Sequence, residues 1–132
     1  MPDTDNNAFT VDIGSFGIKY GDERGELIFD ARFLPNPYYV DSLKALTGKD
    51  KACADYVFNF PAAQKTLRAL TELVLVQAEG FQEQGRTSLK VKVGCTGGQH
   101  RSVALIEALA KEIESAGFLV SVIHRDIKRA NL

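Results

Sequence analysis

Residues 89–102 read LKVKVGCTGGQHRS, and they join a strand to a helix through a glycine turn. Apolar and charged side chains alternate over residues 89–93, which is the period of a strand. Apolar residues then recur at three- and four-residue steps from Val103 to Ile113, which is typical of a helix, and Gly117 ends it. The first N–H groups of a helix lack intrahelical partners and the helix dipole is positive there, so this turn predicts an anion site.

The flanking sequence predicts further elements. We expect strands over residues 9–13, 27–33 and 118–123, a loop over 14–26, short helices over 41–46 and 50–57, and a long helix from Pro61 to about residue 85. Strands separated by helices predict an α/β fold, a three-layer-like sandwich with a small, mainly parallel sheet of about four strands and helices packed on it. Ligands bind beyond the carboxyl ends of such strands. Residues 32–37 and 95–102 are predicted to lie there.

Composition indicates one globular domain. Hydrophobic residues make up 45% of the 132 residues and charged residues 25%, and we expect residues 1–8 to be a flexible tail before a single domain over 9–132. The net charge of -1 does not indicate a nucleic-acid-binding surface, and no apolar run is long enough to span a bilayer. Cys53 and Cys95 form neither a disulfide framework nor a metal spacing. A cytoplasmic protein without a metal or cofactor is expected.

Several motifs follow one another along the chain, namely SFGIKYG at 15–21, FDARFLPNP at 29–37, LTGKD at 46–50 and GCTGGQHRS at 94–102. Through them the chain resembles, from about residue 9 to residue 128, the C-terminal domain family of RapZ, the bacterial RNase adaptor protein. The resemblance implies a non-catalytic module that recognises glucosamine-6-phosphate, contacts small RNAs and takes part in oligomerisation. No G-x-x-x-x-G-K-[ST] motif occurs, so we expect a stand-alone domain without the nucleotide-binding P-loop domain.

The resemblance also assigns site residues and partners. It places the sugar-phosphate pocket at Thr96, Gly97 and Arg101, with a second wall over residues 32–38. Together with the glycine turn, the predicted ligand-binding set is Thr96, Gly97, Gly98, His100, Arg101, Ser102, Arg32, Asn36 and Tyr38. Tyr38 stands where RapZ proteins often have histidine, and Gln99 stands where lysine is expected. The expected partners are an amino sugar phosphate and a small RNA or a protein, with self-association into a homo-oligomer and no membrane.

Two roles remain open for some of these residues. His100 either donates to a phosphate or hydrogen-bonds to local backbone. Arg32 and Asp30 lie two apart on a predicted strand and so share a face, where they form a structural ion pair or contact the ligand. Lys19 is expected to be an exposed loop lysine, and Lys90 and Lys92 to mark an uncovered face of the sheet.

A different function competes for the glycine turn. Cys95, five further residues, Arg101 and Ser102 match the C-x5-R-[ST] loop of cysteine phosphatases, in which the thiolate attacks phosphorus and loop amides hold the oxygens. Asp30 and Asp126 are candidate acids for the leaving group, but neither lies in a segment that matches a phosphatase acid loop. The sequence therefore favours a non-catalytic sensor, with the phosphatase as the alternative.

The basic C-terminal segment is the predicted RNA contact. Arg125, Lys128 and Arg129 provide positive charge, and a cluster of this size predicts modest, salt-sensitive attraction to phosphates. Charged residues near a terminus also serve solubility, and this second explanation stays open.

Overall fold

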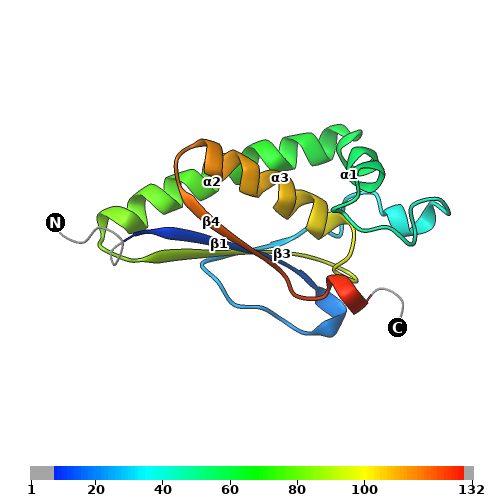
Figure 1. The fold of residues 1–132 in the computed structure, drawn as a ribbon, viewed down its shortest axis with the longest axis horizontal. Coiled ribbons are helices and arrows are strands. Elements are labelled where there is room, and N and C mark those ends of the chain that lie inside the picture. The colour runs from blue at the N-terminus through cyan, green and yellow to red at the C-terminus, as the bar shows by residue number, and fades with distance from the viewer. Residues whose placement is uncertain (1–7, 130–132) are drawn as a thin grey trace.

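The computed structural model describes residues 8–129, and Figure 1 shows how its elements are arranged. The strands are β1 (Thr10–Gly17), β2 (Leu27–Asp30), β3 (Ser88–Cys95) and β4 (Leu119–His124). The α-helices are α1 (Lys51–Phe58), α2 (Pro61–Glu83) and α3 (Arg101–Ser115), and the short 3-10 helices are η2 (Ile18–Tyr20), η3 (Pro37–Tyr39) and η4 (Ile127–Arg129). The predicted tail over 1–8 lies outside the described residues except for Ala8.

The four strands form one parallel sheet in the order β2-β3-β1-β4, which confirms the predicted α/β fold with a parallel sheet. Ile13 at the centre of β1 lies opposite Val91 of β3 on one side and Val122 of β4 on the other. Val91 and Ile13 are buried because they point toward the helices. Lys90, on the other face of β3, is exposed, as the alternation of residues 89–93 predicts.

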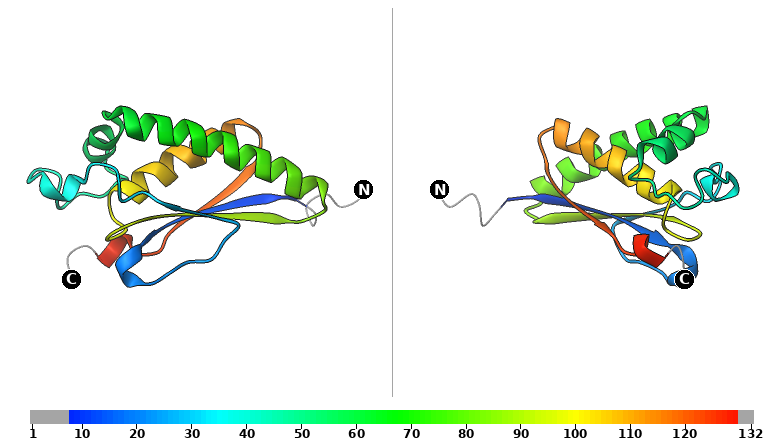
Figure 2. Two further views of the ribbon diagram at one scale, coloured as in Figure 1. Left: turned by 180° about the vertical axis from the view of Figure 1, so that it is seen from behind. Right: turned by 45° about the vertical axis from the view of Figure 1, so that its right-hand side comes forward.

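All the α-helices of residues 8–129 pack on the same face of the sheet (Figure 2), so the sandwich has a single helical layer. Their apolar stripes form the core against the buried side chains of β1 and β3, with members that include Leu70, Val74, Leu105, Leu109 and Ile113. Burying a side chain of this size contributes about 1.5–3 kcal/mol. The opposite face is crossed by the segment of residues 18–26 (Figure 2).

Chain direction explains why that segment crosses the bare face. The helical connections β2–β3 and β3–β4 both move across the sheet toward β4, whereas the β1–β2 connection moves the other way. Crossovers between parallel strands keep one hand, and reversing the direction of movement requires the opposite face to keep it. Residues 18–26 therefore run under the sheet, where the Lys90 N–H donates to Glu26 Oε1 at 2.7 Å.

Three predicted boundaries are wrong. The strand predicted over residues 27–33 ends too late, because β2 stops at Asp30 and the chain then turns, with the Leu34 N–H donating to the Ala31 carbonyl at 3.2 Å. The predicted loop over residues 14–26 begins too early, because β1 continues to Gly17, where it is paired with Cys95 at the end of β3. Glycines interrupt the strand pattern there, but pairing with neighbours on the sheet satisfies the backbone. Residues 41–46 form turns rather than a helix, because only a few i to i+3 and i+4 bonds form between Val40 and Leu46.

Candidate anion-binding site

A cavity of about 600 Å³ lies at the carboxyl ends of β1 and β3, in front of the first turn of α3. Six of the predicted ligand residues line it, namely Asn36, Tyr38, Thr96, Gly97, His100 and Arg101. Its other lining residues are Lys19, Tyr39, Asp41, Lys44, Ala45, Cys95 and Gln99. The structure thus brings the glycine turn and the segment after Pro35 together around one space.

The glycine turn needs glycine because it packs directly on the backbone of β1. Gly98 has a φ of 79°, which side-chain-bearing residues rarely adopt, and a Cβ added there would lie 2.6 Å from the Gly17 nitrogen. Gly17 is equally close, since a Cβ on it would lie 2.6 Å from the Gly97 carbonyl carbon. Gly98 therefore shapes the turn and does not line the cavity.

The turn presents backbone donors that the protein leaves free. Within residues 8–129, the N–H groups of residues 97–101 donate to no protein acceptor. His100 is the N-cap of α3, and its side chain makes no capping hydrogen bond. These donors and the positive end of the α3 dipole act in the same place, which is the usual arrangement of a phosphate site.

Arg101 adds a buried positive charge to the cavity. Arg101 is 5% exposed, and its Nη1 donates to the carbonyl oxygens of Arg32 at 2.8 Å and Leu34 at 3.1 Å. Nη2 lies 3.5 Å from Thr96 Oγ1, and Nε has no hydrogen-bond partner. No carboxylate among the described residues forms an ion pair with this guanidinium. The carbonyls orient the charge without neutralising it.

His100 lines the cavity and its ring is hydrogen-bonded to backbone. Burial lowers the pKa of His100, so the ring is neutral at pH 7, and its Nε2–H donates to the Lys44 carbonyl at 3.2 Å. The Gly48 N–H donates to the Gln99 carbonyl at 2.8 Å alongside it. These two bonds hold residues 44–48 against the start of α3 and so form one wall of the cavity.

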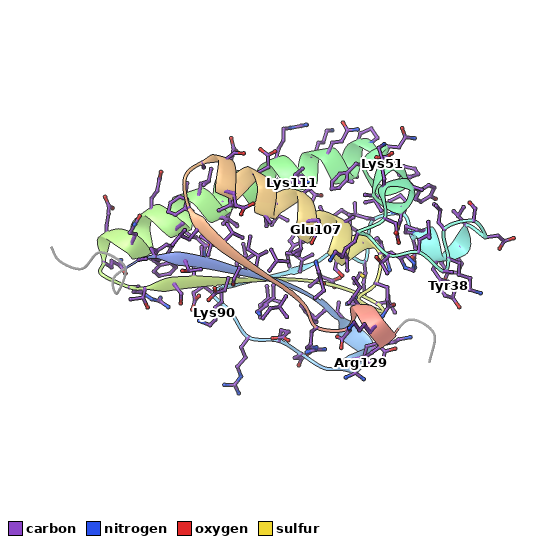
Figure 3. All side chains as sticks on the ribbon, viewed as in Figure 1. Tyr38, Lys51, Lys90, Glu107, Lys111 and Arg129 are labelled. Carbon is purple, nitrogen blue, oxygen red and sulfur yellow. The ribbon has the colours of Figure 1, made fainter. Side chains whose placement is uncertain are left out.

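Asn36 and Tyr38 form the rim on that side. The Asn36 Oδ1 accepts the Tyr38 N–H at 3.1 Å and thereby starts η3. Tyr38 projects at the outer end of the molecule (Figure 3), and Lys44 Nζ lies 4.7 Å from the centre of its ring. The rim therefore combines a π-face with a cation.

Two further predicted residues do not line the cavity. Ser102 is fully buried, with its hydroxyl 3.1 Å from Cys95 Sγ and its N–H donating to the same sulfur at 3.5 Å. Arg32 is exposed and pairs with Asp30, with 2.7 Å between Nη2 and Oδ2, and this hydrogen bond lowers the pKa of Asp30. The structural ion pair is thus formed, and Arg32 reaches the site only through its carbonyl oxygen.

Sequence reasoning missed Lys44 and Asp41, did not include Gln99 in the predicted ligand-binding set, and treated Lys19 as an ordinary exposed loop lysine. Lys19 and Lys44 both line the cavity. The Gln99 side chain donates to the carbonyl of Gly97 and, at 2.8 Å, to that of Asp126, so it ties the turn to the C-terminal segment. The family comparison with lysine drew attention to Gln99, but no local pattern marks Lys44 or Asp41.

The C-terminal arginines are engaged within the fold. Arg125 and Arg129 both pair with the buried Asp126, each at 2.8 Å, and Arg125 also pairs with Glu23 at 3.1 Å. Burial acts to raise the pKa of Asp126, but Arg125 and the Gly17 N–H outweigh it and the net shift is downward. Lys128 is exposed, and Arg129 lies at the same end of the molecule as Tyr38 (Figure 3).

The sequence of this chain matches a known protein family. The sequence model of the RapZ C-terminal domain family matches residues 9–128. This chain belongs to the RapZ C-terminal domain family. A "nucleotide-binding protein" of Bacillus licheniformis is 46% identical over 124 residues, which cover 93% of this chain and 42% of that protein.

Further relatives give the same result. A protein of the same name from Caldicellulosiruptor bescii is 45% identical over 123 residues, or 92% of this chain and 42% of the relative, and one from Limosilactobacillus reuteri is 41% identical over 127 residues, or 96% and 44%. The chain thus spans about two fifths of the length of these curated relatives, and it corresponds to the RapZ C-terminal domain. No helix within residues 8–129 combines the length and apolar character needed to cross a bilayer.

Proposed function

We propose that this RapZ C-terminal domain binds a phosphorylated metabolite in the cavity before α3 and does not transform it. The observation that supports this most is Arg101, a 5% exposed residue that lines the cavity and whose guanidinium has no acidic partner among the described residues. A buried charge without a counter-charge is costly, and a bound anion supplies one. The free N–H groups of residues 97–101 are placed to hold the same phosphate oxygens.

The charges around the cavity favour an amino sugar phosphate. Lys19, Lys44 and Arg101 provide three cations, and Asp41 provides one carboxylate. The cations suit a phosphate dianion, and the carboxylate suits an ammonium group on the same ligand. Glucosamine-6-phosphate has both groups, and it is the ligand that the resemblance to RapZ implies.

Thermal melting tests the assignment. Glucosamine-6-phosphate is expected to raise Tm more than glucose-6-phosphate, whereas glucosamine is expected to have little effect. Asp41→Asn should bring the two phosphate esters closer together, because it removes the charge that distinguishes them. ATP is included because the relatives are named for nucleotide binding, and it should give no shift in a chain without a P-loop motif.

Matched variants show whether the cavity is responsible. Arg101→Ala should abolish the shift, and Arg68→Ala, an exposed arginine on α2, should retain it. Since Arg101 also bonds to two carbonyls inside the fold, Lys44→Ala is the second variant: it removes an exposed cation and should weaken binding without loss of structure. An absence of any shift with phosphate esters, or a full shift in both cavity variants, would contradict the proposal.

We also propose that the ligand-bound domain engages an RNA or a protein, with Lys128 and Arg129 as the RNA contacts. Lys128 is exposed and half of the Arg129 side chain is accessible, while Arg125 is mostly enclosed by its partners. Binding to a structured small RNA should weaken as salt rises, and Lys128→Ala should reduce the salt slope by about one. Sedimentation with and without RNA would also measure the expected self-association. No RNA binding at low salt would remove this part of the proposal.

A cysteine phosphatase is the second candidate, because the Ser102 hydroxyl and N–H both contact Cys95 Sγ. Neither predicted acid supports it, since Asp30 pairs with Arg32 away from the cavity and Asp126 is buried between two arginines. Incubation with p-nitrophenyl phosphate is expected to release no phosphate. If the protein releases phosphate and Cys95→Ser stops the release, the protein is a cysteine phosphatase rather than a sensor.

A further inference from the structure

We propose that Cys95 is a covalent modification site for small, uncharged alkylating electrophiles, and that modification and anion binding exclude each other. This inference rests on the proposed anion-binding function and adds a means of regulating it. Cys95 is the last residue of β3, is 2% exposed and is one of the residues that line the cavity, and we expect a group added to its sulfur to extend into the space in front of α3.

The surroundings of the sulfur suit a nucleophile. Ser102 places its hydroxyl 3.1 Å from Sγ, and its N–H donates to Sγ at 3.5 Å. The sulfur lies beside the first turn of α3, a helix of 15 residues. The Ser102 N–H donates to Sγ, and the Ser102 hydroxyl can turn its proton toward the same atom as the sulfur attacks an electrophile.

Arg101 is an independent indication that the same space binds a ligand. Its side chain is more than nine-tenths buried, it lines the cavity with Cys95, and its Nε has no partner. An anion held by Arg101 and by the N–H groups of residues 97–101 would occupy the approach to Sγ. The bound anion and the electrophile therefore compete for one volume.

Cys53 provides an internal control. It is a fully buried residue of α1 and does not line the cavity before α3. Burial raises the pKa of the Cys53 thiol to about 11. At pH 8 about one Cys53 thiol in a thousand is therefore ionised, so this residue should be nearly inert in the folded protein.

Iodoacetamide is a suitable probe because it is small and uncharged. The sulfur attacks the methylene carbon, a C–S bond forms, the C–I bond breaks, iodide leaves and the thiol proton passes to solvent. The product carries a carboxamidomethyl group on Cys95, in front of the donors of residues 97–101.

The experiment follows alkylation of the folded full chain at pH 8 by peptide mass spectrometry. Cys95 is expected to react at least about tenfold faster than Cys53, since the raised pKa of Cys53 leaves little thiolate. Inorganic phosphate and glucosamine-6-phosphate should each slow the alkylation of Cys95 and leave the alkylation rate of Cys53 unchanged. After alkylation the protein should lose its Tm shift with glucosamine-6-phosphate, whereas iodoacetamide treatment should not alter the shift of Cys95→Ser.

The outcomes separate this inference from the proposed function. A normal Tm shift combined with a Cys95 that reacts no faster than Cys53, or with a rate that neither anion slows, overturns the modification site and leaves the sensor intact. A fast Cys95 in a protein that shows no Tm shift with any phosphate ester overturns the sensor and, with it, the claimed exclusion. Ser102→Ala should slow alkylation of Cys95, and an unchanged rate would remove the assigned role of Ser102.

Discussion

Replacing Gly98 by alanine tests the packing of the glycine turn on β1. The backbone there has a φ of 79°, and for an L-residue the left-handed region costs about 1–2 kcal/mol. The new Cβ would also lie 2.6 Å from the Gly17 nitrogen and 2.9 Å from the Phe16 carbonyl carbon, and both are backbone atoms that cannot rotate away. Such overpacking costs about a further 1–3 kcal/mol.

The total predicted loss is about 2–5 kcal/mol of unfolding free energy. For a chain of 132 residues, an unfolding entropy of about 2.1 cal/mol/K per residue makes 1 kcal/mol equal to about 4 °C in Tm. Melting followed by circular dichroism should therefore show Tm falling by about 8–20 °C, and binding of glucosamine-6-phosphate should fall with it.

Gly85→Ala is the matched control. Gly85 also has a positive φ, 83°, but a Cβ there meets nothing within 4 Å. This variant should lose only the conformational cost of about 1–2 kcal/mol, and it should keep ligand binding. If the two variants melt at the same temperature, the close contact between Gly98 and Gly17 does not support the turn, and the reasoning is refuted.

Three more predictions concern stability. Leu109→Ala in the core should cost about 2–5 kcal/mol in urea unfolding, whereas the 65% exposed Val76→Ala on α2 should cost far less, and equal losses would contradict the assigned core. The folded-state pKa of Asp126 is lowered, so ionised Asp126 stabilises the folded protein above the ordinary pKa of 3.8, and this stabilisation is lost as pH falls through the lowered value. Asp126→Asn should therefore reduce the loss of stability between neutral and acidic pH. An unchanged loss of stability would argue against this role of Asp126. The pKa of His100 is also lowered from 6.5, so the unfolded chain takes up a proton before the folded protein does, and stability should fall as pH drops below 6.5. Denaturation of His100→Gln at pH 7 and pH 5 should show that this pH dependence is removed. A pH dependence that persists would be due to another group.

Local pattern in the sequence accounts for much of the fold. The alternation over residues 89–93 and the helical period after Arg101 correspond to β3 and α3, and the turn between them lies at the cavity. Pro61 correctly marks the start of α2. These elements are predictable because their hydrogen bonds and apolar stripes repeat over short distances along the chain.

Boundaries that depend on neighbouring strands are less predictable. Gly14 and Gly17 suggest a loop, yet both belong to β1 because each is paired with a residue of β3, Gly14 with Lys92 and Gly17 with Cys95. Residues 41–46 have a helical composition, but the Lys44 carbonyl bonds to the His100 ring and the segment forms turns instead. In both places tertiary contacts override a local preference.

The sequence by itself determined the RapZ C-terminal family, the parallel α/β class, and a glycine turn with Arg101 at the start of a helix. Only the tertiary structure decided that Asp41 and Lys44 form a wall of the site, that Ser102 contacts Cys95, and that Arg32 contributes a carbonyl rather than its charge. The bond from His100 to Lys44, which are 56 residues apart, ends on a backbone carbonyl. Every residue has such a carbonyl, so a wall built through backbone acceptors leaves no side-chain pattern in the sequence from which it could be predicted.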